Sequence, residues 1–390
     1  MNFDELIDRR NTHSSKWDSM EKIYGVSPDT GLAMWVADMD FRPPAVVQDA
    51  LQNMLDHGVY GYYGEDQSYR EAICWWMQTR HGWTVDPKAI LTTHGLVNGV
   101  AFCLDALTEP GDGVVIMTPV YHAFARVIRA GGREVVECEL ARRDGRYEMD
   151  FDAWDAQMTG REKMLILCSP HNPGGRVWTR DELRGVAEFA RRHDLLLISD
   201  EIHHDLVMPG HSHIPMPLAD ETILDRLIMM TATTKTFNIA GSHTGNVIVP
   251  DETLRARLTA HLAAMGKSPN SFGLVMAEAA YSPEGAEWVD ALVPYLDGNR
   301  RIFEEGLAQI PGVKPMSLEA TYLTWIDFAD TGMAPAEVIR RVQQDAQIAP
   351  NHGATFGKGG ESFLRFNIAT PRSRVEEAVR RMQAAFGDLQ

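Results

Sequence analysis

Cysteine is scarce in this chain of 390 residues. The four cysteines are Cys74, Cys103, Cys138 and Cys168. No two of them form a Cys-x-x-Cys pair, which argues against both a disulfide framework and a cysteine-rich metal site. Most of them lie in apolar surroundings, so we expect free, buried thiols in a reducing cytoplasm.

Long apolar runs and an excess of positive charge are also missing. No run reaches membrane-spanning length, and the first residues, Met1 to Glu5, lack the basic start of a signal peptide. The chain has 37 Lys and Arg residues against 54 Asp and Glu residues, a formal net charge of −17. This balance argues against binding to nucleic acids or acidic membranes. We therefore expect a cytoplasmic protein without nucleic-acid or membrane partners.

Repeats, low-complexity tracts and the common nucleotide-binding motifs are absent too. The chain contains no G-x-x-x-x-G-K-[ST] motif, and no convincing G-x-G-x-x-G follows a predicted strand. These absences argue against a nucleoside-triphosphate site and weaken a nicotinamide interpretation.

The middle of the chain alternates short apolar runs with helical patterns. Strands are predicted over residues 89–93, 113–118, 133–138, 163–168, 195–199, 226–231 and 246–249. Most are almost continuously apolar, as expected of strands that helices cover on both faces. The capping box Thr179-Arg180-Asp181-Glu182 opens an amphipathic helix over residues 183–193. This alternation predicts an α/β fold with a mainly parallel central sheet.

The C-terminal part has a different pattern, which predicts a smaller α+β domain. Strands are expected at residues 322–328 and 363–368, with a helix near 336–344 between them. A last helix is expected to open with the capping box Ser373-Arg374-Val375-Glu376. We assign residues 45–285 to the large domain, and residues 1–44 with 286–390 to the small one.

Lys235 lies just after the apolar run 227–230, within a stretch rich in hydroxyl residues. A lysine there is badly placed for a surface ion pair. It is well placed to form a Schiff base with an aldehyde cofactor whose phosphate needs hydroxyl donors nearby. Taken alone, a lysine at a strand end is more often structural, so other positions have to decide between the two.

Asp200 follows another apolar strand. A carboxylate at a buried strand end is costly unless it meets a positive partner, such as a protonated pyridine nitrogen. An acidic cap on the next loop is the alternative. The nearby histidines are His203, His204, His211 and His213. Adjacent histidines on an extended segment cannot both point at one ion, so no metal site is predicted.

Three further loops follow predicted strands. Asn172 lies in the proline- and glycine-rich loop 169–175, which is either a rigid mount for its amide or a polar turn. Gly95 lies where a strand turns into a helix, a natural phosphate cradle. Tyr121 could stack on a flat cofactor or belong to the core. In open α/β sheets, ligands bind at the carboxyl ends of strands.

Arg365 lies in the predicted strand 363–368. Strand alternation puts Leu364, Phe366 and Ile368 on an apolar face and Arg365 on the other. The guanidinium group could pair with a substrate carboxylate, or it could form a surface ion pair.

The order of these pieces resembles the fold-type I pyridoxal-phosphate enzymes of the class I/II aminotransferase superfamily. The resemblance runs from about Met34 to the C-terminus. Four sequence segments are most similar to the MalY/PatB branch of cystathionine β-lyases and related carbon–sulfur lyases: residues 34–41, 60–62, 200–203 and 235–241.

The resemblance implies a role for each position. Lys235 would carry pyridoxal 5′-phosphate and later transfer protons, and Asp200 would hold the pyridinium nitrogen. Asn172 would bind the ring 3-oxygen, Tyr121 would stack on the ring, and His203 would stand where many aminotransferases have a tyrosine. Three residues would hold the phosphate: Gly95, Leu96 and Thr234. Tyr62 would reach in from the partner subunit of a homodimer. The substrate-binding residues would be Arg365, Asn172 and Ala37.

One departure from the family pattern concerns the phosphate, because His243 stands where many aminotransferases have an arginine eight residues after the lysine. The branch resemblance favours a carbon–sulfur β-lyase acting on cystathionine or other cysteine S-conjugates. The alternative is an aminotransferase, which would use the same residues. A regulatory or binding module is disfavoured, because Lys235, Asp200 and Arg365 are all present.

Overall fold

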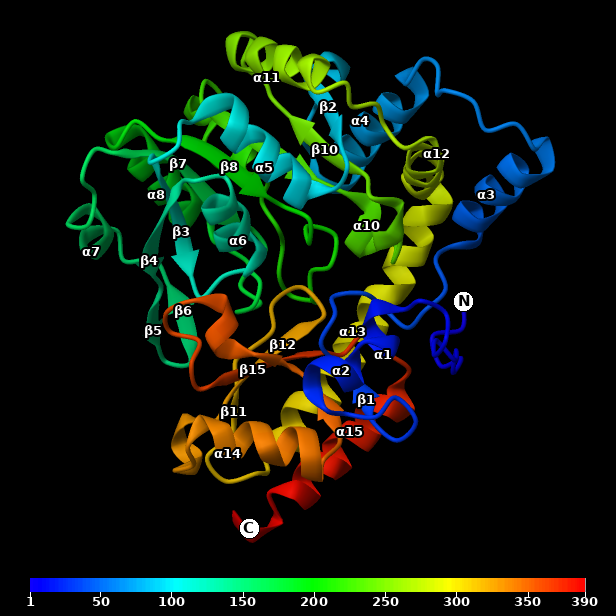
Figure 1. Ribbon diagram of the computed structural model, residues 1–390, viewed down its shortest axis with the longest axis vertical. Coiled ribbons are helices and arrows are strands. Elements are labelled where there is room, and N and C mark those ends of the chain that lie inside the picture. Colours follow the sequence, from blue (N-terminus) through cyan, green and yellow to red (C-terminus); the bar gives the residue numbers. More distant parts are fainter. Residues whose placement is uncertain (390) are drawn as a thin grey trace.

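The computed structural model describes residues 1–389, and its largest sheet has seven strands (Figure 1). In spatial order they are β2 (Ile90–Thr93), β10 (Gly245–Ile248), β9 (Leu227–Thr231), β8 (Leu196–Asp200), β7 (Glu162–Cys168), β3 (Gly113–Thr118) and β4 (Glu134–Glu139). Only β10 runs antiparallel to its neighbours. The predicted α/β fold with a mainly parallel sheet is therefore confirmed.

Helices cover both faces of this sheet. One face packs against α5 (Leu96–Leu107), α6 (Ala123–Ala130) and α11 (Glu252–Ala264). The other packs against α4 (Gln67–His81), α8 (Arg180–Arg192) and α12 (Ser271–Ala280). Neighbouring strand residues divide between the two cores: Ile166 belongs to the first, and Leu165 and Leu167 to the second. Burial on both sides explains the continuous apolar runs.

The predicted capping box at the start of α8 is present. The Thr179 hydroxyl accepts a hydrogen bond from the Glu182 N–H at 3.2 Å, and the Glu182 carboxylate accepts one from the Thr179 N–H at 2.7 Å. These bonds satisfy donors that have no partner within the helix. The remaining elements of the large-sheet region and the N-terminal segment are α1 (Ser15–Asp18), α2 (Met20–Tyr24), α3 (Ala45–His57), β5 (Ala141–Arg143), β6 (Arg146–Glu148), α7 (Phe151–Asp155), α9 (Met216–Ala219) and α10 (Thr233–Thr236).

The second sheet is antiparallel and has four strands, in the order β11 (Lys314–Pro315), β12 (Leu323–Asp327), β15 (Phe363–Asn367) and β14 (Asn351–His352). Its helices are α13 (Pro283–Leu307), α14 (Pro335–Arg340) and α15 (Arg372–Ala385). In Figure 1, α13 leads from the region of the large sheet down to this sheet. The N-terminal strand β1 (Leu32–Ala33) pairs with β13 (Ile348–Ala349). The domain boundaries near residues 44 and 285 stay a prediction.

The predicted cap of the last helix is wrong. Helix α15 begins at Arg372, with Pro371 as its N-cap and no side-chain cap, so Ser373 already lies in the first turn. The Arg372 N–H instead donates to the Tyr295 hydroxyl at 2.7 Å. A tertiary contact thus provides a hydrogen-bond acceptor at the start of the helix, which the local capping box was expected to supply.

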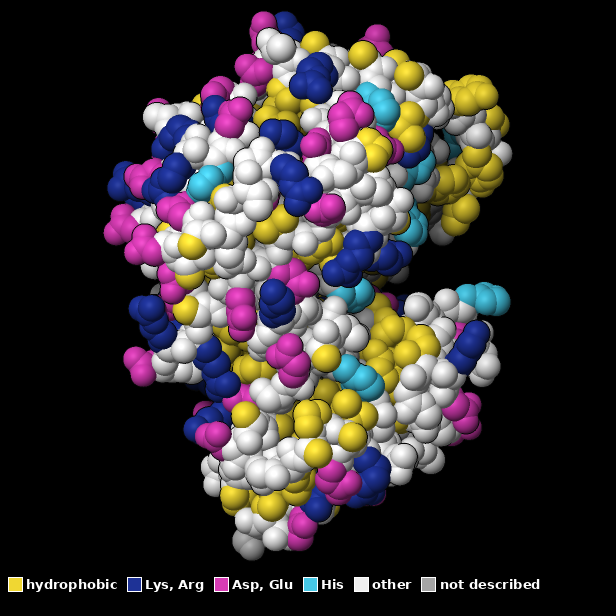
Figure 2. Space-filling model, turned by 60° about the vertical axis from the view of Figure 1, so that its left-hand side comes forward, with side chains coloured by type: hydrophobic (Ala, Val, Ile, Leu, Met, Phe, Trp, Pro, Cys, Tyr) yellow, Lys and Arg dark blue, Asp and Glu magenta, His cyan; other side chains and the backbone are white. Residues whose placement is uncertain are grey.

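Among the described residues, all four cysteines are free, and three of them are buried. No helix in residues 1–389 combines the length and hydropathy that crossing a bilayer requires. On the face shown in Figure 2, acidic and basic side chains are interspersed. The cytoplasmic location stays a prediction.

Asp40 anchors the N-terminal segment through a buried ionic cluster. Its carboxylate lies 3.1 Å from Lys16 Nζ, 2.9 Å from Arg9 Nη1 and 3.3 Å from Arg374 Nη1. The Trp17 indole N–H donates to it at 3.0 Å. Burial by itself raises the pKa of Asp40, but the charges of Lys16, Arg374 and Arg9 outweigh it and hold the pKa well below its usual range.

Replacing Asp40 with Asn should destabilise the protein by about 3–5 kcal/mol at pH 7, because Lys16 would stay buried beside a neutral amide. Urea unfolding of wild type and Asp40→Asn measures the difference. The contribution is present above the unfolded pKa of about 3.9 and is lost as the pH falls through the lowered folded pKa. Asp8→Asn, which removes an exposed pair with Arg10, is the matched control. Equal urea midpoints of unfolding for Asp40→Asn and Asp8→Asn would contradict the prediction.

Candidate active site

The carboxyl ends of five strands meet at one edge of the large sheet. The segments that follow β2, β3 and β7 carry Gly95, Tyr121 and Asn172; Asp200 ends β8, and Lys235 follows β9. All five line one cavity of about 240 Å³. The structure therefore brings together residues that are up to 140 positions apart in the sequence, at the edge where open α/β sheets bind ligands.

Lys235 lies in α10, the short helix that begins two residues after β9 ends. Its Nζ donates a hydrogen bond to the Ala37 carbonyl at 2.6 Å. Burial and the charge of Arg365 lower the pKa of Lys235 to about 8, although the carboxylates of Asp38 and Asp200 oppose the shift. About a tenth of this amine is therefore neutral, and so nucleophilic, at pH 7, far more than for an ordinary lysine.

Asp200 presents a buried carboxyl group that forms no ion pair with any residue in 1–389. Its Oδ1 accepts a hydrogen bond from the Ile202 N–H at 3.2 Å. Burial, with a smaller contribution from the neighbouring Glu201, raises the pKa of Asp200 to about 7, despite the opposing charge of Lys235. A buried carboxyl group of this kind favours a cationic or N–H-donating ligand.

Arg365 is hydrogen-bonded to Asn172, which lines the cavity. Arg365 Nη1 donates to Asn172 Oδ1 at 2.9 Å, and Nη2 donates to the Trp35 carbonyl at 2.8 Å and to Asn351 Oδ1. Arg365 is only 2% exposed, and burial lowers its pKa to about 10. The surface ion pair considered from the sequence is therefore wrong, because β15 is buried on both faces.

The turn between β2 and α5 lines another part of the cavity wall. Gly95 is the N-cap of α5 and has a φ of 85°, a backbone conformation that favours glycine. Leu96 begins the helix, and Thr234 lines the same cavity, as do His94 and His243. The N–H groups at the start of α5, together with the Thr234 hydroxyl, could hold an anionic group.

His203 and Tyr121 also line the cavity. The His203 ring is buried, with its centroid 6.1 Å from that of Tyr322, and its Nδ1 has no hydrogen-bond partner within residues 1–389. Burial and the nearby charges of Lys235 and Arg365 lower the pKa of His203 well below its usual range. The ring is therefore neutral at physiological pH. Burial raises the pKa of Tyr121.

Of two further predicted site residues, Ala37 lines the cavity and Tyr62 does not. The Ala37 carbonyl accepts hydrogen bonds from Lys235 and, at 3.0 Å, from the Tyr322 hydroxyl. Tyr62 does not line the cavity of its own chain: it lies between α3 and α4 and is fully exposed. A role for Tyr62 in a partner subunit stays a prediction.

Sequence reasoning missed three neighbours of the site: Tyr322, Asn351 and the carbonyl of Trp35. Tyr322 precedes a strand, and Asn351 belongs to a strand of only two residues, which is too short to show a pattern. No signal in the sequence marks these residues as close to Arg365 or Lys235.

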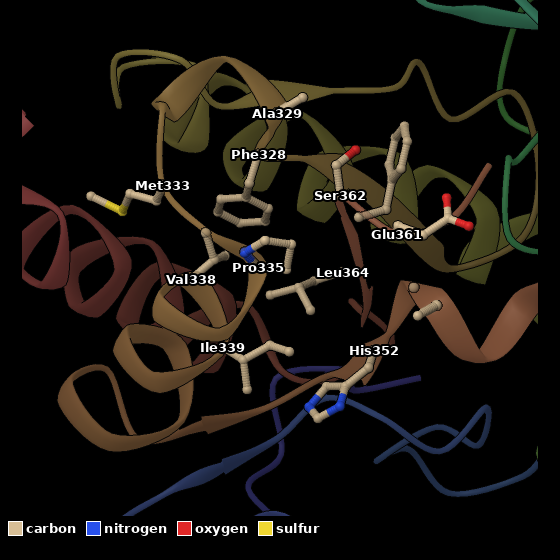
Figure 3. A pocket seen from close by; sticks show the side chains of 13 residues that line it. Phe328, Ala329, Met333, Pro335, Val338, Ile339, His352, Glu361, Ser362 and Leu364 are labelled. Carbon is tan, nitrogen blue, oxygen red and sulfur yellow. The ribbon is translucent and has the colours of Figure 1, made fainter. Parts of the chain in front are cut away.

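A second cavity, of about 90 Å³, lies beside the four-stranded sheet. Figure 3 shows Phe328, Pro335, Val338 and Leu364 turned toward one another around it, with His352 at its lower side. This lining is mostly apolar and lacks the converging charged groups of the Lys235 cavity. We therefore place the candidate active site at Lys235.

Because the pKa of Asp200 is raised, the stability of the ligand-free protein should depend on pH. A carboxyl group with a raised folded pKa contributes most stability below its unfolded pKa of about 3.9 and loses it as the pH rises toward 7. Urea unfolding measures the free energy of unfolding of the ligand-free proteins. Relative to wild type, this free energy should rise for Asp200→Asn by up to about 1.4 kcal/mol per pH unit between pH 5 and 7. Asp220→Asn, at a carboxyl group with a lowered pKa, should show no such trend. A pH-independent difference for Asp200→Asn would refute the prediction.

Comparison with known proteins agrees with this geometry. The sequence profile of the family described as aminotransferase class I and II matches residues 36–382. Cystathionine beta-lyase PatB of Bacillus subtilis (strain 168) is 39% identical over 388 residues, which cover 99% of this chain and 100% of that protein.

Two solved structures extend the comparison. The crystal structure of cystalysin from Treponema denticola, which contains a pyridoxal 5′-phosphate cofactor, matches with a TM-score of 0.94 and 37% identity, covering 100% of this chain and 99% of that one. The PLP-bound C-S lyase from Staphylococcus hominis matches with a TM-score of 0.90 and 31% identity, covering 99% and 98%. Lys235 and Asp200 line one cavity, and Arg365 is hydrogen-bonded to Asn172 in its wall. With this geometry and a profile match over most of its length, the chain belongs to the aminotransferase class I and II family.

Proposed function

We propose that this protein is a pyridoxal-phosphate-dependent carbon–sulfur β-lyase. Its substrates would be cystathionine or other cysteine S-conjugates, and its products pyruvate, ammonia and a thiol. The observation that carries the proposal is the Lys235 amine, whose pKa is lowered to about 8, in one cavity with the uncompensated carboxyl group of Asp200. The likeness to PatB, over the full length of both chains, supports this choice of reaction.

The residues present fit the cofactor. A pyridinium N–H would give the buried Asp200 carboxylate the positive partner that it lacks among the described residues. The N–H groups at the start of α5 and the Thr234 hydroxyl suit a phosphate, near which His94 and His243 offer further donors. Tyr121 offers a ring for stacking, and Lys235 offers the amine that an aldehyde requires. When bound, pyridoxal phosphate supplies a sink for the electron pair left at the substrate Cα.

Asn172 can serve two partners at once. Because its Oδ1 accepts from Arg365, its Nδ2 is left to donate toward the ring 3-oxygen. The same hydrogen bond orients the Arg365 guanidinium, which would bind the carboxylate of the substrate as a bidentate pair. Cofactor and substrate recognition are thus connected through one amide.

Lys235 would perform the proton transfers. With a pKa of about 8, the amine can be neutral at the Cα proton that it removes and protonated when it returns a proton. The neutral His203 adds no charge to the site. Loss of the thiolate from Cβ, followed by hydrolysis, would then yield pyruvate and ammonia.

We also propose a homodimer in which Tyr62 reaches the partner's cavity. Apolar side chains are exposed on α3 and on the segment after it: Leu55, Val59, Tyr60 and Tyr62. This segment extends away from the rest of the chain in Figure 1. Exposed apolar groups clustered in this way are typical of protein interfaces.

Borohydride should fix the cofactor covalently to Lys235. Reduction of the purified protein, followed by peptide mass spectrometry, should place a pyridoxyl phosphate group on the peptide that contains Lys235, because the lowered pKa makes this amine reactive. Lys235→Ala should lose the label, and Lys88→Ala, at an exposed lysine, should keep it. Label retained by Lys235→Ala would disprove the assignment.

The reaction type can be tested by its requirement for a keto acid. With cystathionine alone, the protein should form pyruvate, ammonia and a free thiol in equal amounts, detected with lactate dehydrogenase, indophenol and a thiol reagent. L-Alanine, which has no leaving group on Cβ, is the matched control and should give no pyruvate. If cystathionine is inert and L-alanine yields pyruvate once 2-oxoglutarate is added, the protein is an aminotransferase and the lyase proposal fails.

A further inference from the structure

A second group of titratable side chains lies outside the Lys235 cavity. His81 at the end of α4 meets His204 and Asp205 from the loop after β8, and His213 lies beside them. These four side chains line a separate cavity of about 400 Å³. None of them has a part in the function proposed above.

Three of these side chains bring potential ligand atoms together. One atom each from His81, His204 and Asp205 lie within 4.8 Å of one another. His81 Nε2 is 2.8 Å from Asp205 Oδ1, and His204 Nε2 is 3.2 Å from Asp205 Oδ2. The two imidazole rings stack, with their centroids 4.2 Å apart. Two imidazoles and a carboxylate form a common ligand set for divalent transition metals.

His204 is poorly satisfied in this environment. It is 1% exposed, and neither of its ring nitrogens makes a hydrogen bond with good geometry to any residue in 1–389. Buried polar atoms are rarely left without partners, and an ion or a water is a common reason for an exception. The ring nitrogens of His204 are therefore available to bind a ligand.

The surroundings also favour a cation. His213 Nε2 lies 2.6 Å from Glu201 Oε2, and the ring centroids of His213 and His204 are 6.2 Å apart. Glu201 and Asp205 thus place two buried carboxylates beside three imidazoles.

We propose that His81, His204 and Asp205 bind one divalent transition-metal ion, such as Zn²⁺, with water in the fourth position. Zn–N bonds of about 2.0 Å in a tetrahedral site put ligand atoms roughly 3.3 Å apart. His81 Nε2 and Asp205 Oδ1, which are 2.8 Å apart, must therefore separate slightly, and the stacked rings must turn toward the ion. Adjacent histidines argued against metal from the sequence, but His203 faces the Lys235 cavity, and the second imidazole comes from His81.

Calorimetry with Zn²⁺ tests the site on the cofactor-loaded protein after removal of metals by a chelator. Wild type should bind one equivalent at pH 7.5. His204→Gln and His81→Gln should each weaken binding at least tenfold. His193→Gln, at a more exposed histidine that pairs with Asp155, is the matched control and should change nothing.

X-ray absorption of the zinc-loaded wild type provides a measurement that does not depend on any variant folding correctly. It should report two imidazole ligands and only nitrogen and oxygen donors. Absence of a stoichiometric site, an affinity unchanged in both variants, or a first shell with sulfur or fewer than two imidazoles would each overturn the proposal.

Discussion

The candidate active-site region depends on one irregular stretch of backbone, residues 34–41, whose peptide groups are satisfied partly by other backbone groups and partly by side chains. Buried peptide groups are costly without partners, and a segment outside regular structure cannot supply its own. Asn367 of β15 therefore donates to the carbonyls of Val36 and Asp38. From the other side, Asn238, just beyond α10, bonds the peptide groups of Met39 and Phe41. Asp40 then joins the ionic cluster of the N-terminal segment. The segment is held from both sheets, so its carbonyl groups can act as fixed parts of the site.

The same stretch positions the reactive groups. The Ala37 carbonyl receives both the Lys235 ammonium and the Tyr322 hydroxyl, and the Trp35 carbonyl receives Arg365. Neutral carbonyls orient these cations without neutralising them. A buried carboxylate in their place would stabilise the charged amine and raise the pKa of Lys235, whereas here burial and the nearby guanidinium lower it to about 8. The fold thus holds the lysine in place while keeping it able to lose its proton.

The sequence allowed the large sheet and the strand-end residues to be predicted, because parallel strands buried on both faces appear as continuous apolar runs that stop at polar residues. Lys235 and Asp200 follow such runs directly. The surroundings of Arg365 could not be predicted in the same way: alternation along β15 suggested one free face, but residues 34–41 cover it. The Tyr322–Ala37 contact joins positions 285 residues apart, and no local pattern encodes it. The cap expected at Ser373 failed for a similar reason, since a contact with Tyr295 set where the helix begins.

The loop after β8 connects the two polar regions of the large sheet. It begins with Asp200 in the Lys235 cavity and continues to Asp205, which accepts hydrogen bonds from the Trp76 indole at 2.9 Å and from the Thr236 hydroxyl at 2.8 Å. Thr236 is the residue after Lys235, so one hydrogen bond separates the histidine cluster from the helix that carries the lysine. Asp205 thus contacts both His81 and Thr236, and the packing around it leaves little empty space. The histidine cluster therefore lies one residue and one hydrogen bond away from Lys235, although it lies outside the cavity.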